Sequence, residues 1–387
     1  MTGQDADESG DGAGVQIVPG YGKSTLAELS QSLLASLGVP GEENVLGLPR
    51  ASRACLLVVD GLGWDLLKAH RSAAPFLAGL ADETGCWLTA GFPATTVTSL
   101  SSLGTGRPPG QHGLLGYQVR VPGTGRLLNA LRWDNSVDPV AWQPASTIFE
   151  RAAAAGISAL RIASGAYKNS GLSVAAMRGA DYRPAETPGA LVGQAAAALA
   201  EAPRAVAMVY TGDLDGTGHA WGCTSPAWRY QLGHVDRLAE QLAGALPAGT
   251  ILYVTADHGM VDVSPDGRRD ADLLPQLREG VALLGGEPRA RHVYARPGAA
   301  REVLAAWRDT LAASAWVVSR DEAIDAGWFG PVDHRVADRI GDVVAAARGS
   351  SAVVATVAEP RESALIGMHG SLAASDQRVP LLTYAAG

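Results

Sequence analysis

The sequence contains few cysteines, and their number and spacing argue against a framework of disulfide bonds. Only three occur among 387 residues, at the widely separated positions Cys55, Cys86 and Cys223. Secreted proteins that depend on disulfides carry paired cysteines, whereas proteins of reducing compartments keep them as free thiols. We therefore expect a cytoplasmic protein in which all three side chains are small buried apolar groups.

Long apolar runs are also missing, together with any segment typical of export. No run of about 18 uncharged apolar residues is present, the length that a bilayer-spanning helix needs. The first 14 residues, MTGQDADESGDGAG, include four acids and neither a basic nor an apolar region, so they do not resemble a signal peptide. We expect residues 1–14 to be a disordered acidic tail, and we expect no membrane partner.

Basic side chains are in deficit. The chain has 31 Lys and Arg residues against 39 Asp and Glu residues, a formal net charge of −8. Proteins that hold long nucleic acids need a Lys- and Arg-rich surface for the phosphates, so this balance argues against a long nucleic-acid partner. It does not exclude a small phosphate ligand, because a bound metal ion inverts the local charge.

Three apolar segments each end in a cluster of aspartate, glycine and histidine residues. They are ACLLVVDGLG at 54–63, AVAMVYTGDLDGTGH at 205–219 and TILYVTADHGM at 250–260. Continuous apolar runs of this length are typical of strands buried on both faces, as in a parallel sheet. Segments with helical spacing lie between them, at Asp65–Leu80 and Pro226–Leu246. The alternation predicts an α/β fold, a doubly wound, mostly parallel central sheet with helices on both faces.

Two regions interrupt this pattern. Residues near 107–190 are rich in Gly, Pro and Trp, and residues near 265–350 mix short helical and strand-like segments. Domains commonly contain about 100–200 residues, so the length allows one large domain with insertions or two domains. We expect a single α/β domain over 15–387, with cap insertions near 107–190 and 265–350.

Polar residues follow the three apolar segments at the points where the strands are expected to end. Asp60 follows the first, Asp213, Asp215 and His219 follow the second, and Asp257 and His258 follow the third. One Asp-Gly pair is commonly only a turn. In open α/β sheets, however, the active site lies beyond the carboxyl ends of the strands, so we expect these side chains to converge. Crowded carboxylates need a cation, and mixed Asp and His ligands suit Zn²⁺ or Mn²⁺ better than Ca²⁺ or Mg²⁺.

A candidate nucleophile lies in the segment GFPATTVTSLSSLGTG at 91–106. Hydroxyl residues Thr95, Thr96, Thr98 and Ser99 are expected at the start of a short helix. The free N–H groups of a helix N-terminus stabilise an alkoxide or a phosphate. Helix capping by Ser or Thr is the alternative interpretation of the same residues.

Five blocks of this sequence together match a known family. They are LLVVDGLGWD (56–65), FPATTVTSLSSLGTGRPPGQHGLLGY (92–117), DLDGTGHAWG (213–222), VTADHGM (254–260) and MHGS (368–371). In this order they resemble the alkaline phosphatase superfamily, specifically its nucleotide pyrophosphatase/phosphodiesterase branch. The resemblance implies an alkaline phosphatase-like fold. The two expected insertions match this family poorly.

The resemblance also implies roles for individual residues. Thr96 would be the nucleophile, and two divalent metal ions, Zn or Mn, would be bound beside it. One ion would be held by Asp215, His219 and His369. The other would be held by Asp60, Asp257, His258 and the Thr96 oxygen. Ser99 stands where members of the branch usually carry an asparagine that helps to stabilise the phosphate charge.

Within the branch, the chain looks most like actinobacterial proteins that hydrolyse cyclic di-AMP to the linear dinucleotide pApA and AMP. The implied activity is hydrolysis of a nucleotide phosphodiester through a phosphothreonine intermediate, with a small nucleotide as partner. Alternatives are a nucleotide pyrophosphatase, a phosphomonoesterase, a phosphonoacetate hydrolase, or a non-enzymatic nucleotide- or metal-binding sensor. A homo-oligomer is left open. Four aromatic residues are candidates for contact with a nucleobase, with packing roles as the alternative: Tyr117, Trp133, Tyr167 and Trp221.

Overall fold

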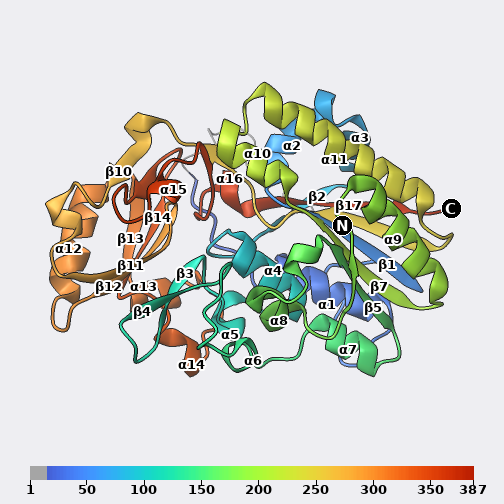
Figure 1. The fold of residues 1–387 in the computed structure, drawn as a ribbon, viewed down its shortest axis with the longest axis horizontal. Helices are drawn as coiled ribbons and strands as arrows, with labels where there is room; N and C mark the ends of the chain where they lie inside the picture. The colour runs from blue at the N-terminus through green and yellow to red at the C-terminus, as the bar shows by residue number, and fades with distance from the viewer. Residues whose placement is uncertain (1–14) are drawn as a thin grey trace.

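A computed structural model describes residues 15–387 of the protein (Figure 1). The predicted acidic tail, residues 1–14, lies outside the described residues. A seven-stranded sheet with the strand order β2-β17-β8-β1-β7-β5-β6 forms the centre of the molecule. Its strands are β1 (Arg53–Val59), β2 (Cys86–Thr89), β5 (Ser158–Ala163), β6 (Asp181–Pro184), β7 (Ala205–Thr211), β8 (Thr250–Thr255) and β17 (Arg378–Ala385).

The central sheet is mostly parallel. Strands β8, β1, β7, β5 and β6 all run in the same direction, whereas β17 is antiparallel to both of its neighbours, β8 and β2. The three predicted apolar runs are β1, β7 and β8, and nearly every residue in them is buried. Continuous burial on both faces is what a central parallel strand requires, so the predicted α/β fold is confirmed.

Helices cover both faces of the central sheet (Figure 1). One face carries α1 (Leu26–Ser36), α4 (Thr96–Thr105), α7 (Ile148–Ala154) and α8 (Gly171–Met177). The other carries α2 (Trp64–Ala69), α3 (Pro75–Glu83), α9 (Pro188–Glu201), α10 (Asp213–Trp221) and α11 (Pro226–Ala245). No helix within residues 15–387 is both long enough and apolar enough to cross a membrane.

One predicted helix is interrupted. The segment Asp65–Leu80, which the apolar spacing predicts as helical throughout, contains α2, a short 3-10 turn at Arg71–Ala73, and then α3. The break precedes Pro75, which begins α3. Proline lacks an N–H and restricts the preceding residue, and it is therefore tolerated at a helix start but not within a helix.

A second, smaller sheet lies beside the first and is antiparallel, with the order β11-β12-β14-β13. Its strands are β11 (Val281–Glu287), β12 (Ala290–Ala295), β13 (Ala315–Ser319) and β14 (Val343–Ala347). Trp307 and Leu311 of helix α12 (Ala300–Leu311) pack on it in a separate apolar cluster. These elements fall within the predicted insertion near 265–350.

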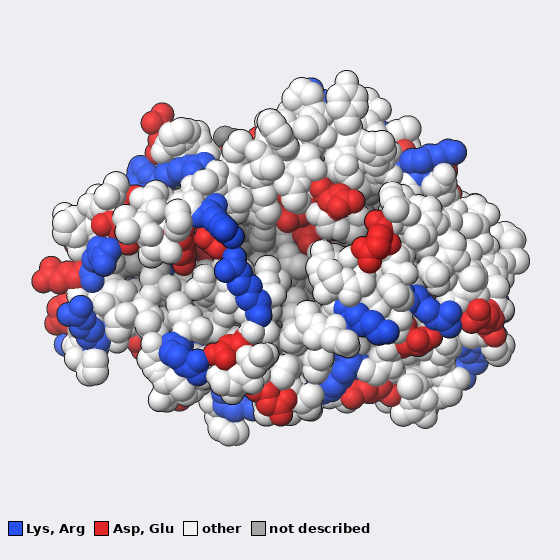
Figure 2. All heavy atoms as spheres, viewed as in Figure 1, with Lys and Arg blue, Asp and Glu red and all other residues white. Residues whose placement is uncertain are grey.

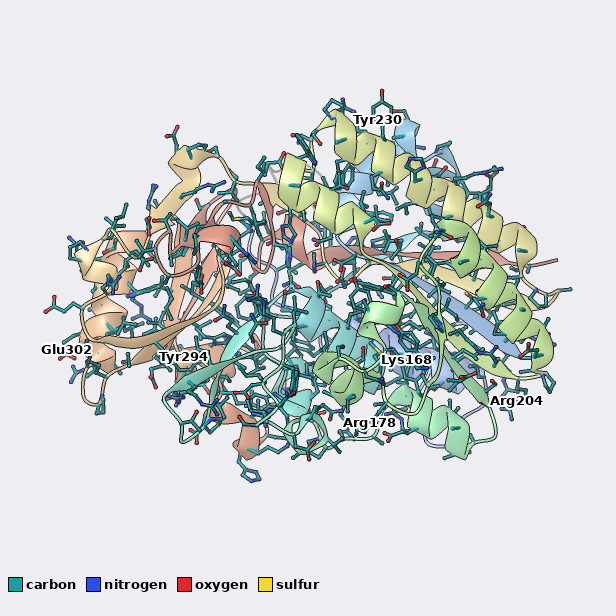
Figure 3. The ribbon with its side chains drawn as sticks, viewed as in Figure 1. Lys168, Arg178, Arg204, Tyr230, Tyr294 and Glu302 are labelled. Atoms are coloured by element: carbon teal, nitrogen blue, oxygen red, sulfur yellow. The ribbon has the colours of Figure 1, made fainter. Side chains whose placement is uncertain are left out.

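The hairpin of β3 (Gln118–Val121) and β4 (Arg126–Asn129) joins this sheet to the rest of the chain. Figure 3 shows Tyr294 of β12 in this region, where its hydroxyl accepts a hydrogen bond from Arg120 N (2.9 Å) and donates one to Arg339 O (2.7 Å). Strands β5 and β6 of the central sheet also fall inside the range 107–190, so only part of that range lies outside the sheet. One domain with two insertions stays a prediction.

The cysteines differ in their environments. Cys55 and Cys223 are buried free thiols, as expected. Cys86 is exposed, so the expectation of three buried side chains is wrong at this position. The reason is that Cys86 begins β2, which forms an edge of the central sheet and has only one neighbouring strand.

Candidate active site

The register of the central strands brings the predicted acids to one edge of the sheet. Val58 of β1 lies opposite Tyr210 of β7 and Thr255 of β8, so the three strands end at the same level. Asp60 follows β1, and Asp257 follows β8 after one residue. Asp215 lies in the first turn of α10, which begins directly after β7, and acids are favourable there because of the helix dipole.

The glycine after Asp60 permits this close approach. Gly61 has a positive φ of 75°, and a Cβ at this position would lie 3.2 Å from the Asp215 Cα. Its N–H donates a hydrogen bond to Asp257 Oδ1 at 3.1 Å. The Asp-Gly pair therefore serves both as a turn and as a contact that holds the three carboxylates together.

Two groups of side chains offer ligand atoms within 4.8 Å of one another. One group is Asp60, Asp257 and His258, and the other is Asp215, His258 and His369. His258 Nε2 lies 3.3 Å from Asp60 Oδ1 and 3.5 Å from Asp257 Oδ2. The imidazole of His258 stacks on that of His369 with 3.6 Å between the ring centroids, so the two groups adjoin.

His219 joins the second group through Asp215. Its Nε2 is 3.2 Å from Asp215 Oδ2, one helical turn away on α10. The other Asp215 oxygen is 3.8 Å from His369 Nε2. All six residues that the resemblance names as ligands therefore lie in one cluster, and His258 is common to both compact groups.

Each histidine of the cluster has its Nδ1 next to a backbone carbonyl oxygen. The partners are Gly367 O for His219 (2.7 Å), Gly259 O for His258 (2.9 Å) and Ala94 O for His369 (3.0 Å). A carbonyl only accepts, so Nδ1 carries a proton, and Nε2 is the nitrogen that faces the cluster and offers a lone pair once it is unprotonated. Metal-binding histidines are commonly oriented by such a partner on the second ring nitrogen.

The carboxylates of the cluster contain buried oxygens that have no hydrogen-bond partner: Asp60 Oδ1, Asp215 Oδ1 and Asp257 Oδ2. Burial, with the charges of Asp257 and Asp215, raises the pKa of Asp60 well above its usual range. Burial and the Asp215 charge raise the pKa of Asp257 to about 7. Three buried carboxyls side by side are ionised together only when a cation compensates them, so these residues fit divalent metal ions.

Neighbouring charges also shift the pKa values on α10. Burial opposes ionisation of Asp215, but His219 and His369 beside it lower the pKa of this carboxyl well below the usual value. Burial likewise opposes the charged form of His219, and Asp215 outweighs it and raises the pKa of His219 to about 9. These two groups therefore form a charged pair while no metal is bound.

Thr96 is the hydroxyl that reaches the cluster. It is the first residue of α4, and its Oγ1 lies 3.4 Å from Asp60 Oδ2 and 3.3 Å from His258 Nε2. Thr95 at the N-cap makes no side-chain capping bond, so capping does not account for the hydroxyls here. Thr95, Thr98 and Ser99 are buried, whereas Thr96 is partly open.

Two cavities adjoin Thr96. One has a volume of about 420 Å³ and is lined by Tyr167, Tyr210 and Arg161, among others. The second, of about 310 Å³, is lined by Tyr117, Glu287 and His219, among others. Both include Thr96, Asp215 and Leu131 in their walls. Figure 2 shows acidic side chains within the hollow at the middle of this face.

Only some of the residues predicted to contact the substrate line these cavities. Tyr117 and Tyr167 line one cavity each. Trp133 instead packs against Gly171 and donates its indole N–H to Val137 O at 2.8 Å. Trp221 is 67 % exposed at the end of α10 and lines neither cavity, and Ser99 is fully buried with no partner for its hydroxyl. Aromatic composition does not reveal which way a ring faces, which is why two of the four candidates lie elsewhere.

The sequence analysis missed three residues of the site. Tyr210 donates a hydrogen bond to Asp60 Oδ2 from within an apolar strand. Burial raises the pKa of Glu287 to about 8, and its Oε2 accepts from Tyr117 N at 2.8 Å. Arg161 interrupts the apolar segment SALRIA of β5, and this interruption was the one signal that could have identified it.

Comparisons with known proteins identify the family and the fold. The sequence matches the profile of a family described as Type I phosphodiesterase / nucleotide pyrophosphatase over residues 54–372. No curated protein matches the sequence. Among solved structures, an inactive variant of murine ectonucleotide pyrophosphatase/phosphodiesterase 5 in complex with AMP is 20% identical, with a TM-score of 0.67 over 85% of this chain and 87% of the other.

Two further structures share the fold. The human ectonucleotide pyrophosphatase/phosphodiesterase 5 is 19% identical, with a TM-score of 0.64 over 86% of this chain and 87% of the other. Phosphonoacetate hydrolase from Sinorhizobium meliloti, in complex with phosphonoacetate, is 21% identical, with a TM-score of 0.63 over 87% of this chain and 90% of the other. Because the family profile covers most of the sequence, the chain belongs to the Type I phosphodiesterase / nucleotide pyrophosphatase family and is a hydrolytic enzyme.

Proposed function

We propose that the protein hydrolyses a phosphodiester of a small nucleotide with Thr96 as its nucleophile. The observation that carries the proposal is the position of the Thr96 hydroxyl, 3.4 Å from Asp60 and 3.3 Å from His258, at the meeting point of two groups of metal-ligand residues. A nucleophile of this kind needs an activating neighbour, and both groups supply one.

We assign two divalent ions, Zn or Mn, to the cluster. Asp215, His219 and His369 would hold one, and Asp60, Asp257, His258 and the Thr96 oxygen would hold the other. When bound, such ions lower the pKa of a coordinated hydroxyl and neutralise charge on the attacking and leaving oxygens of an in-line displacement. The unpartnered carboxylate oxygens and the Nε2 lone pairs of the histidines support this assignment.

The chain's own residues would carry the reaction in two displacements. The Thr96 hydroxyl gives its proton to water as Oγ1 forms a bond to phosphorus. The bond to the leaving alcohol breaks, and the departing oxygen takes a proton from water. The resulting phosphothreonine is then hydrolysed when a water oxygen attacks phosphorus and the hydroxyl of Thr96 is regenerated. The N-terminal N–H groups of α4 favour negative charge on the phosphate throughout.

The substrate we propose is cyclic di-AMP, cleaved to pApA and AMP. A diester has two substituents on its phosphate, and cavities of about 420 and 310 Å³ meet at Thr96. Tyr167 and Tyr210 line the first cavity, and Tyr117 lines the second. The AMP complex of the murine structure supports a nucleotide in a site of this fold. A monoester or phosphonoacetate would leave one of the two cavities unused, and a binding-only sensor has no need of the nucleophile.

A substrate panel tests this proposal. Metal-reconstituted protein is incubated with cyclic dinucleotides, dinucleotide polyphosphates and NAD, and the products are identified by chromatography. We expect pApA and AMP from cyclic di-AMP, and faster hydrolysis of bis-p-nitrophenyl phosphate than of the monoester. Cleavage of pyrophosphate-linked compounds alone would exclude the cyclic substrate, and faster monoester hydrolysis would exclude a diesterase. A cytoplasmic location and a homo-oligomer stay predictions.

A further inference from the structure

Arg161 is a buried arginine that lacks an acidic partner. It lies in β5, is 2 % exposed, and forms no ion pair with any acid among residues 15–387. Two other buried arginines pair with acids, since Arg289 binds Asp376 at 2.8 Å and Arg291 binds Glu359 at 2.7 Å. A third, Arg339, donates instead to the carbonyl oxygens of Gly113 and Trp142. Buried arginines are rarely left unpaired, because removing an isolated charge from water is costly.

The hydrogen-bonding capacity of Arg161 is mostly unused. One terminal nitrogen, Nη1, contacts the sulfur atoms of Met208 (2.9 Å) and Met177 (3.7 Å). Thioether sulfur is a weak acceptor, and a guanidinium has five N–H donors. Its Nε is buried without any partner, and burial lowers the pKa of Arg161. No acidic side chain among residues 15–387 pairs with this charge, and a cation–π contact with the Tyr210 ring compensates it only in part.

The guanidinium faces the cavity that leads to Thr96. Arg161 lines the cavity of about 420 Å³, and its Cζ lies 5.4 Å from the centre of the Tyr210 ring. The Tyr210 hydroxyl in turn bonds to Asp60, which is the neighbour of Thr96 Oγ1. A chain of contacts through Tyr210 and Asp60 therefore connects Arg161 with Thr96, and Arg161 and Thr96 both line this cavity.

We propose that Arg161 binds a second phosphate group of the substrate, carried by the arm that enters this cavity. This inference rests on the proposed phosphodiesterase function and extends it to substrates with two phosphates, such as a dinucleotide or a nucleoside bisphosphate. A phosphate matches the planar fork of a guanidinium and supplies the missing negative charge. A neutral base edge in its place would leave the charge of Arg161 uncompensated.

Calorimetric titration measures the preference directly and does not depend on turnover. Metal-reconstituted protein is titrated with AMP and with adenosine 3′,5′-bisphosphate, which differ by one phosphate. Charge-assisted hydrogen bonds give an expected preference of about 10- to 100-fold for the bisphosphate. The Arg161→Met variant should bring the ratio of the two dissociation constants close to one. A ratio near one in the wild type, or an unchanged ratio in the variant, overturns the proposal.

A matched control comes from the neighbouring strand. Arg183 of β6 is next to β5 and pairs with Asp181 (2.8 Å) and Glu201 (3.3 Å) outside the cavity. The Arg183→Met variant removes the same charge and should keep the wild-type ratio. If Arg183→Met also brought the ratio of the two dissociation constants close to one, the preference would depend on overall charge, and the role proposed for Arg161 would be overturned.

Thermal stability separates ligand binding from a structural role. Because the charge of Arg161 is unpaired, Arg161→Met should melt at or above the wild-type temperature without ligand. A lower melting temperature with equal weakening of both ligands would mean a structural role and overturn the proposal. If Arg161→Met does not fold, Arg161→Lys serves instead, because it keeps the charge but lacks the planar guanidinium. This variant should reduce the ratio of the two dissociation constants, and a ratio equal to that of the wild type would contradict the proposal. Absence of turnover with the preference intact would reject the proposed reaction but not this binding role.

Discussion

At the scale of single residues, the site depends on which atom of each side chain is left free. The Nδ1 atoms of His219, His258 and His369 are all occupied by backbone carbonyls, so their Nε2 atoms face the acids. Among the four hydroxyls at the start of α4, that of Thr96 contacts Asp60 and His258 of the cluster, and Thr96 lines both cavities. Substitutions that replace a single functional group at these positions should therefore have large effects on turnover or on metal binding.

Replacing Thr96 with valine should abolish turnover. Valine has the shape of threonine without the hydroxyl, so we expect kcat to fall by at least about 1,000-fold, as when other nucleophiles are removed. Thr98→Val is the matched control, because the Thr98 hydroxyl is buried with no partner and its removal should leave kcat unchanged. Hydrolysis of bis-p-nitrophenyl phosphate provides the measurement. A Thr96→Val enzyme of near wild-type activity would show that another group attacks.

Asp215 and Asp213 offer a second matched pair on α10. Asp215 has an unpartnered oxygen in the cluster, whereas Asp213 is exposed in the same helical turn. Asp215→Asn should lower the bound metal from about two ions per chain toward one, because one anionic ligand is lost. Asp213→Asn should retain the full content. Elemental analysis of dialysed protein decides the matter, and equal metal content in both variants would exclude Asp215 as a ligand.

At the scale of secondary-structure elements, two buried neutral histidines connect separate segments. His292 of β12 accepts from Gly341 N (3.1 Å) at Nδ1 and donates to Leu115 O (2.9 Å) from Nε2. His112 of α5 (Pro109–His112) accepts from Leu114 N and binds the Ser102 hydroxyl of α4. Both rings have one donor and one acceptor in use, so neither can take a proton without losing a bond.

These histidines should make the fold sensitive to acid. Burial lowers the pKa of His292 to about 4 and that of His112 to about 3. Both pKa values are depressed, so the unfolded chain binds these protons first and stability falls as the pH drops from about 6.5 toward 4. The expected slope is about 1.4 kcal/mol per pH unit for each group.

Denaturant unfolding of His292→Asn at several pH values between 4.5 and 7 measures this effect. The variant should be less stable than the wild type at pH 7, and the difference should shrink as the pH falls. Exposed His234→Asn is the control and should follow the wild-type pH dependence. A constant difference between wild type and His292→Asn would mean that His292 does not take up a proton on unfolding in this range.

Some strands of the central sheet could be predicted from the sequence, and others could not. Strands β1, β7 and β8 are buried on both faces, so an unbroken apolar run marks each one. Strand β6, with the sequence DYRP, is an edge strand that is only partly buried, and no apolar run marks it. The convergence of the acids that follow β1, β7 and β8 was predictable, because the carboxyl ends of parallel strands lie at the same edge of a sheet. His369 was found by resemblance alone, and Tyr210 and Glu287 were missed because burial of a single polar side chain leaves no periodic pattern.

At the scale of the whole molecule, the net charge of −8 includes the three acids of the cluster. One oxygen of each acid has no hydrogen-bond partner, and without cations the neighbouring carboxyls oppose one another's ionisation. The folded chain alone assembles all of these ligands, because they come from residues far apart in the sequence. Metal binding should therefore stabilise the folded state against the unfolded one.

Removal of metal with EDTA should lower the melting temperature of the protein. With free metal at about 100 times its dissociation constant, the stabilisation expected from one site is about 2.7 kcal/mol. Addition of Zn²⁺ or Mn²⁺ should restore the original melting temperature, and Asp257→Asn should reduce the response. Differential scanning calorimetry gives the comparison. Identical melting curves with and without EDTA would contradict a metal site in this cluster.

The position of β17 has a consequence for how the protein is made. Among the described strands, β2 pairs only with β17, which is synthesised far later and also borders β8. Until β17 has been made, β2 has no neighbouring strand, although Thr89 N can bond to Ser24 O, and one side of β8 is uncovered. His369 also emerges shortly before β17. The nascent chain therefore completes its sheet and its catalytic centre only once the segment from His369 to β17 has been made.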